Sequence, residues 1–155
     1  MNDKAKQARE IFDNGFNCSQ AVLASFAPSY DLSPDMALRI AGAFGAGMGR
    51  MGQVCGAVTG AFMTIGLVAA KTKPREEAMR DRGYALVRSF TERFNALHGT
   101  INCRELIGID LSTDTGLDEA REKGVFQSHC ARFVEDAAGI LDEILSKPSG
   151  FPVNR

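Results

Sequence analysis

Apolar residues recur along most of the chain at spacings of three and four, the period of a helix that buries one face. The pattern predicts a first helix over residues 3–14 and a second that starts after Asn17, a side chain suited to capping a helix. Ser33 and Pro34 form a cap and first-position pair for a third helix over residues 35–44. No segment shows the alternation of a half-buried strand, so the expected fold class is all-α, a single-domain bundle of about six to seven helices.

A glycine-rich loop and a charge-free helix occupy the middle of the sequence, residues 42–70. The helix is expected to carry Cys55 in its first turn, and Gly56 and Gly60 would let another backbone approach closely. The charge-free run is shorter than the ~20 residues that span a bilayer, which favours a fully buried central helix over a membrane helix. The loop contains five glycines that open backbone conformations which side chains disfavour: Gly42, Gly45, Gly47, Gly49 and Gly52.

Three more helices are expected in the second half of the chain. One covers residues 75–97 and has a polar face turned to solvent. The next begins at Asn102, which repeats the Asn-Cys helix start, and the last begins near Ser128. Between these two, residues 110–123 are polar and are expected to hold one short helix from Leu117.

The overall composition is that of a soluble globular domain, with 45% hydrophobic and 24% charged residues. A net charge of −1 provides no basic surface for nucleic acid, so no nucleic-acid partner is expected. The first ten residues lack the apolar core of a secretory signal, which favours a cytoplasmic location. We expect one domain over residues 1–147, a frayed tail over 148–155 and no membrane insertion, with a homodimer left open.

Each of the four cysteines falls in the first turn of an expected helix and leads its apolar stripe: Cys18, Cys55, Cys103 and Cys130. At that position, free N–H groups and the positive end of the helix dipole stabilise a thiolate. The spacing contains no Cys-x-x-Cys pair, so it matches no standard zinc or thioredoxin-like pattern. Cysteine is also a common core residue, but four of four at helix starts favour a shared redox site.

Converging thiols are compatible with two kinds of redox chemistry. In the first, all four ligate an iron–sulfur cluster or another metal ion for electron transfer or redox sensing. In the alternative, the protein is a metal-free thiol–disulfide oxidoreductase or sensor that uses a reversible cysteine pair. A third possibility is a helical scaffold in which the cysteines only pack. The residues leave open whether the protein is an enzyme and which redox partner it serves.

The glycine loop is expected to bring backbone amides close to the sulfurs and to help bind a cofactor. The candidate cofactor-binding residues are Gly47, Gly49, Arg50, Gly52 and Gly56. The loop follows a predicted helix and lacks a Gly-Lys-Ser ending, so it matches a nucleotide-phosphate cradle only superficially. His129 adjoins Cys130, but adjacent helical residues point in different directions, which disfavours an activated Cys-His pair.

Several of these motifs occur together in one known family. Gly-Phe-Asn-Cys-Ser-Gln-Ala-Val at 15–22, the glycine loop at 44–52 and Cys-Gly-Ala-Val-Thr-Gly at 55–60 precede two single cysteines. Over residues 15–145 this arrangement resembles the C_GCAxxG_C_C family of redox-active proteins. The resemblance implies that the four cysteines are the family's own, with a redox role in bacteria or archaea and no established substrate. Residues 108–127 match nothing in this pattern.

Overall fold

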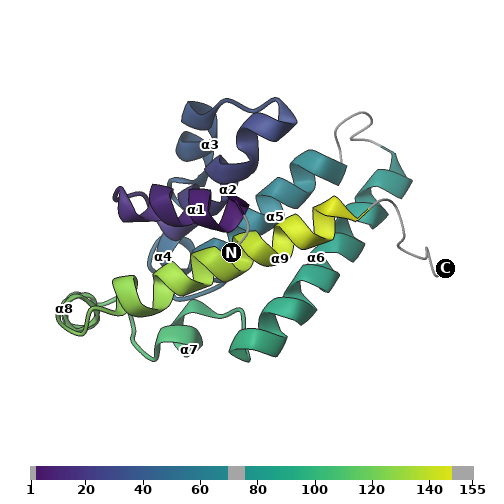
Figure 1. Cartoon of the computed structure of the whole chain (residues 1–155). Helices are drawn as coiled ribbons and strands as arrows, with labels where there is room; N and C mark the ends of the chain where they lie inside the picture. The colour runs from purple at the N-terminus through teal and green to yellow at the C-terminus, as the bar shows by residue number, and fades with distance from the viewer. Residues whose placement is uncertain (1–2, 70–75, 148–155) are drawn as a thin grey trace.

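The computed structural model describes residues 3–69 and 76–147, and all of the regular elements in these two ranges are helical (Figure 1). The chain is an all-α single domain, as the hydrophobic pattern predicted. The one extended pairing in these ranges is an isolated bridge between Val54 and Asn102. In chain order the elements are α1 (Asp3–Asp13), α2 (Cys18–Phe26), the 3₁₀-helix η1 (Ala27–Tyr30), α3 (Pro34–Ala41), α4 (Gly45–Met48), α5 (Gly56–Ala69), α6 (Glu77–His98), α7 (Cys103–Ile107), α8 (Asp114–Glu122), the π-helical turn η2 (Phe126–Cys130) and α9 (Ala131–Ser146).

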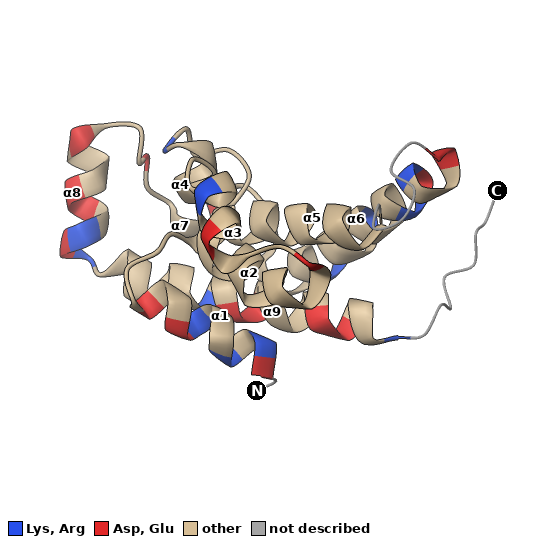
Figure 2. Cartoon of the chain, turned by 90° about the horizontal axis from the view of Figure 1, so that it is seen from above, with Lys and Arg blue, Asp and Glu red and all other residues tan. Residues whose placement is uncertain are grey.

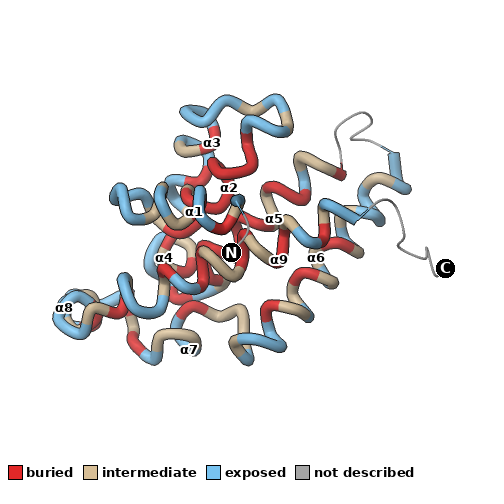
Figure 3. Tube along the Cα trace, in the orientation of Figure 1, coloured by how far each residue is buried: buried red, intermediate tan, exposed pale blue. Residues whose placement is uncertain are grey.

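Helix α2 lies at the centre of the bundle and contacts α1, α3, α5 and α9. Eight of its nine residues are buried, and Figure 3 shows this burial along its length. Helix α5 is buried chiefly in its first half, whereas Gly66 is exposed. Gly66 and Leu67 border a surface hollow that Ile40 also lines. Ile40 is distant in sequence, so the hydrophobic pattern of α5 could not predict this hollow. The expectation that α5 is buried all round was therefore wrong, and α2 fits that description better.

Small residues allow α5 to cross α2 closely, as the spacing of Gly56 and Gly60 predicted. A Cβ added at Gly60 would lie 2.7 Å from the carbonyl oxygen of Ser19, so this position excludes a side chain. Next to the crossing, the Thr59 hydroxyl lies 3.3 Å from the Ser19 hydroxyl and donates to the Gly56 carbonyl at 3.1 Å. The crossing brings the first residues of the two helices together.

Side-chain caps set the starts of α2, α3, α7 and α8. Asn17 accepts from the Gln20 N–H at 2.9 Å while its own N–H donates to the Gln20 side chain at 3.0 Å, which is a complete capping box. Asn102 caps α7 in a similar way through the Glu105 N–H, at 3.2 Å. These predicted starts are confirmed, whereas α8 begins at Asp114, earlier than the expected Leu117, because Thr113 provides its cap.

Two cysteines lie just outside the helices they were expected to start. Helix α5 begins at Gly56, and Cys55 is the residue before it: its carbonyl accepts from the Thr59 N–H at 2.9 Å, while its own N–H donates to the Ile101 carbonyl at 2.8 Å. Helix α9 begins at Ala131, and Cys130 ends the π-helical turn before it. The prediction that all four cysteines occupy first turns of α-helices therefore holds for Cys18 and Cys103 only.

Some predicted features fall outside the described residues, namely the start of the helix expected over residues 75–97 and the tail over residues 148–155. Within residues 3–69 and 76–147, none of the helices combines the length and apolarity needed to cross a bilayer.

Candidate redox site

The four cysteines line a single pocket, and residues of α4, α7, α8 and the start of α9 also line it. These helices lie on one side of the bundle (Figure 1). The pocket has a volume of about 490 Å³, which lies within the ~300–1,000 Å³ typical of small-molecule sites. Cys18, Cys55 and Cys103 are buried, Cys130 is partly exposed, and all four are free thiols. Residues that are far apart in sequence thus meet around one cavity.

Cys18 and Cys55 are in hydrogen-bond contact at the base of this pocket. The contact depends on the absence of a side chain at Gly56, because a Cβ there would lie 2.2 Å from the Cys18 sulfur. The same Cβ would lie 3.1 Å from the Cα of Gly45, so the glycine loop also presses on this point. The close approach to the Cys18 sulfur is therefore made at Gly56, the first residue of α5, with Gly45 of the glycine loop beside it.

Residues 46–50, which include most of α4, form a left-handed turn beside the sulfurs. All five have positive φ, between 55° and 70°, so α4 is not a right-handed helix. A left-handed conformation costs roughly 1–2 kcal/mol for each residue with a side chain, here Ala46, Met48 and Arg50. The turn is fixed at Gly47, where a Cβ would lie 2.7 Å from the Cβ of Cys103. Such backbone strain tends to be kept where it serves a site.

The surroundings of the Cys18 sulfur favour its thiolate form. The S–H of Cys55 donates to it, and the backbone N–H groups of Ala46, Ser19 and Cys18 itself add further hydrogen bonds. Together these donors lower the pKa of Cys18 to about 7, although burial acts in the opposite direction. The left-handed turn contributes to this effect directly, since it is the turn that aims the Ala46 N–H at the sulfur.

The other three thiols are held in the protonated form. The pKa of Cys55 lies well above that of an ordinary thiol, because its proton is held by Cys18 and because the sulfur is buried. Burial raises the pKa of Cys103 to about 12, with a contribution from the charge on Cys18. Burial and the charges of Cys18 and Cys103 likewise raise the pKa of Cys130. The pocket therefore holds one activated sulfur and three thiols.

A short antiparallel pairing places Cys103 opposite the glycine loop. The N–H of Cys103 donates to the Gln53 carbonyl at 2.7 Å, and the N–H of Cys55 donates to the Ile101 carbonyl at 2.8 Å. Between these two hydrogen bonds lies the bridge that joins Val54 to Asn102. The pairing ties the start of α5 to the start of α7, so Cys55 and Cys103 are positioned by the same structure.

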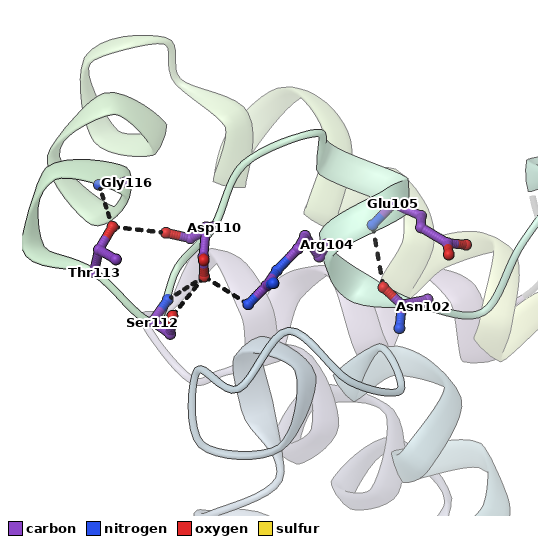
Figure 4. A network of polar contacts seen from close by, with 7 residues as sticks. All are labelled: Asn102, Arg104, Glu105, Asp110, Ser112, Thr113 and Gly116. Atoms are coloured by element: carbon purple, nitrogen blue, oxygen red, sulfur yellow. Dashed lines mark hydrogen bonds and ion pairs between the residues drawn. The ribbon is translucent and has the colours of Figure 1, made fainter.

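A polar network holds α8 over the pocket (Figure 4). The Asp110 carboxylate accepts from Arg104 at 2.8 Å and from the Ser112 hydroxyl at 2.6 Å. The hydroxyl of Thr113 then caps α8 by accepting from the Gly116 N–H at 3.0 Å. A Cβ at Gly116 would lie 1.8 Å from the Asp110 carbonyl oxygen, so α8 sits directly on this loop. From the sequence, this segment matched nothing in the family pattern and its helix was expected to begin at Leu117. Thr113 before Asp114 is nevertheless a recognisable helix cap.

The remaining candidate residues divide into two groups. Gly49 and Arg50 line the pocket, whereas Gly52 packs against the side chain of Arg104. The histidines lie elsewhere: the Nε2 atom of His98 is 3.1 Å from an Asp136 oxygen, and His129 is 2.8 Å from the Ser128 hydroxyl. The pairing of His98 with Asp136 joins α6 to α9 and has no signal in the sequence.

The structure does not confirm a metal site at the four thiols. Within the described part of the chain, no group of three or more Cys, His, Asp or Glu side chains is arranged to hold a metal ion. Cys18 and Cys55 are in contact, whereas the charge of Cys18 reaches Cys103 and Cys130 without a hydrogen bond to either.

Comparison with known proteins gives one match. No curated protein and no solved structure matches the chain. The family model described as "Putative redox-active protein (C_GCAxxG_C_C)" matches residues 16–144, a range that contains all four cysteines and the left-handed turn. The chain therefore belongs to the C_GCAxxG_C_C family of redox-active proteins.

Proposed function

We propose that this protein carries out thiol–disulfide exchange, with Cys18 as the attacking thiolate and Cys55 as the resolving thiol. The contact between the two sulfurs, with the pKa of Cys18 lowered and that of Cys55 raised, is the observation that carries the proposal. Exchange requires a thiolate with a pKa near the ambient pH and a second thiol within reach. Membership of a family described as redox-active supports the same chemistry.

The reaction follows from the two protonation states. The Cys18 thiolate attacks one sulfur of a disulfide, R–S–S–R, so that a Cys18–S–R bond forms while the substrate S–S bond breaks. The departing R–S⁻ takes a proton from solvent. The Cys55 thiol then loses its proton and attacks the Cys18 sulfur, which forms the Cys18–Cys55 disulfide and releases the second R–S⁻ to take up that proton. Two electrons pass from the cysteine pair to the substrate, which leaves as two thiols.

The surroundings of Cys18 make the second step follow the first. While Cys18 is a thiolate, its charge and its hydrogen bond from Cys55 both raise the Cys55 pKa. Both influences disappear once the Cys18 sulfur is bonded to the sulfur of the S–R group. Cys55 then ionises more readily, just before it attacks Cys18. In the reverse direction, the same N–H groups that stabilise the Cys18 thiolate make it a good leaving group.

A reducing compartment such as the cytoplasm, which the sequence favours, would regenerate the dithiol between turnovers. The chemistry serves an oxidoreductase or a redox sensor equally well, because both use a reversible cysteine pair.

The gathering of four thiols around one cavity favours a second candidate, an iron–sulfur or other metal centre. It requires Cys103 and Cys130 to lose their protons and to move toward Cys18 and Cys55. Iron and acid-labile sulfide measured in protein purified without oxygen test this candidate. About one metal centre per chain would support it, and iron-free protein with four titratable thiols would end it.

Trapping of the mixed disulfide tests the exchange mechanism. The Cys55→Ser protein should retain the R group on Cys18 after reaction with a small disulfide, because no resolving thiol remains. The Cys18→Ser protein should form much less adduct under the same conditions, since burial still raises the pKa values of its remaining thiols. Intact-protein and peptide mass spectrometry locate the adduct. An adduct carried mainly by Cys103 or Cys130 would contradict the assignment.

A further inference from the structure

We infer that the substrate of this pocket is a small organic disulfide or thiol with an anionic group, carboxylate or phosphate, bound by Arg50 and Arg121 at the pocket's rim. The inference rests on the proposed exchange function and adds the substrate class to it. The charge, the shape and the pairing of the residues around the cavity support it.

Apart from the Cys18 thiolate, the charged side chains that line the pocket are all positive. Among the described residues, those that line it include Arg50 and Arg121 but no Asp, Glu, Lys or His. The two arginines come from the left-handed turn and from α8, which stands at the outer edge of the molecule in both views (Figures 1 and 2). In a chain of net charge −1, a pocket whose rim carries two arginines and no carboxylate favours anions.

Both arginines are available to a ligand. Within the described part of the chain, Arg50 has no carboxylate partner, and its side chain is exposed. Arg121 reaches Asp118 at 3.5 Å, but both side chains are more than half exposed, so that pair is weak. By contrast, Arg104, outside the pocket lining, is paired with a carboxylate at 2.8 Å. A guanidinium without a strong partner is well suited to bind a carboxylate or phosphate with two hydrogen bonds.

The walls of the pocket are suited to the organic part of such a molecule. Apolar side chains from several elements surround the cysteines, among them Phe16, Leu106, Leu117, Phe126 and Phe133. Cys18 lies at the buried end and the arginines at the exposed end, so a bound disulfide can reach the thiolate while its anionic group stays away from it. Attack by Cys18 transfers one half of the disulfide to that sulfur and releases the other half as a thiol, as in the exchange reaction above.

A pair of aromatic disulfides that differ in charge tests the inference. The first is 5,5′-dithiobis(2-nitrobenzoate), which has a carboxylate on each ring, and the second is uncharged 4,4′-dithiodipyridine. The rate constant of the Cys18 phase is measured by stopped-flow absorbance at pH 7.5, and loss of that phase in Cys18→Ser identifies it. Since both probes meet the same thiolate, the ratio of their rate constants isolates the contribution of substrate charge.

Arg50→Gln and Arg121→Gln should each lower the rate with the anionic probe by about three- to five-fold, the range expected of an exposed ion pair, and leave the neutral probe unchanged. Arg50→Lys should recover most of the loss. Arg88→Gln is the matched control, because Arg88 is exposed on α6 and does not line the pocket. Equal effects on both probes, or no effect on either, would overturn the inference.

A second readout separates this inference from the exchange function. In the Cys18→Ser background, 2-nitrobenzoate, which has no sulfur, is titrated by NMR and should bind about three- to five-fold more weakly after Arg50→Gln. If neither probe shows a phase that Cys18→Ser removes, while 2-nitrobenzoate binding still depends on Arg50, the exchange function alone is refuted. If exchange is retained but the affinity for 2-nitrobenzoate is unchanged by Arg50→Gln and by Arg121→Gln, the anion site alone is refuted.

Discussion

Replacement of Gly56 by alanine is the perturbation that most sharply separates the Cys18–Cys55 contact from ordinary packing. The new Cβ would lie 2.2 Å from the Cys18 sulfur, well inside van der Waals contact, so the sulfur has to move away from its place beside Cys55. A hydrogen bond to a charged group contributes about 1.5–3 kcal/mol, so its loss should raise the pKa of Cys18 by about one to two. Cys18 would then titrate close to an ordinary thiol instead of near pH 7.

The same substitution should change the free energy of unfolding only modestly. Alanine in place of a helical glycine gains about 0.5–1 kcal/mol, and overpacking at this site costs about 1–3 kcal/mol. The net loss in the free energy of unfolding should therefore be about 0–2.5 kcal/mol. Gly66→Ala is the matched control in the same helix, because a Cβ there meets no atom within 4 Å. It should leave the Cys18 pKa unchanged and stabilise the protein by the helix-propensity gain alone.

The assay is the pH dependence of the alkylation rate of Cys18 by iodoacetamide, followed by peptide mass spectrometry, together with urea unfolding of the same samples. The expected result is a midpoint near 7 in the unmodified and Gly66→Ala proteins and a higher midpoint in Gly56→Ala. A folded Gly56→Ala protein whose Cys18 still titrates near 7 would refute the claim that contact with Cys55 activates this sulfur.

Three further predictions concern stability, each measured as the free energy of unfolding in urea. Gly47→Ala should destabilise the protein by about 1–3 kcal/mol, because φ is 70° there and a Cβ would lie 2.7 Å from the Cβ of Cys103. Gly139→Ala should not destabilise it, because a Cβ there meets no atom within 4 Å. Equal effects of the two substitutions would contradict this reasoning. Asn17→Ala should cost about 1 kcal/mol through loss of the capping box, and a cost near zero would show that the cap is dispensable. Burial lowers the pKa of His98 despite Asp136, so the folded protein binds its proton less readily than the unfolded chain. Stability should therefore fall as the pH drops below the ordinary histidine range near 6.5, and His98→Asn should reduce this dependence; stability that rises toward pH 5 would contradict the assignment.

The predictable features of this site are those that depend on local chemistry. Asn17 and Asn102 were identifiable as caps because a side-chain acceptor at a helix start bonds to N–H groups a few residues away. The close approach at Gly56 and Gly60 was predictable because small residues four apart share one helix face. Local signals of this kind also indicated the positions of Cys18 and Cys103.

The features that escaped prediction depend on backbone handedness and on contacts between distant segments. Glycines at 45, 47 and 49 permit positive φ, but they do not show that Ala46, Met48 and Arg50 adopt it too. The start of α5 was misplaced by one residue, and the pairing of the Cys55 N–H with Ile101, far along the chain, was not predictable from the local pattern. The anionic selectivity inferred for the pocket likewise depends on α8 folding back beside the left-handed turn, which no periodicity encodes.

Disulfide mapping of the unmodified protein tests the central claim most directly. The reduced protein is treated with one equivalent of a mild disulfide oxidant, alkylated in denaturant, digested without reduction and examined by peptide mass spectrometry. The exchange mechanism predicts that one linkage, Cys18 to Cys55, dominates, with Cys103 and Cys130 recovered as alkylated thiols. A dominant linkage that includes Cys103 or Cys130, or a random mixture of all pairings, would contradict it.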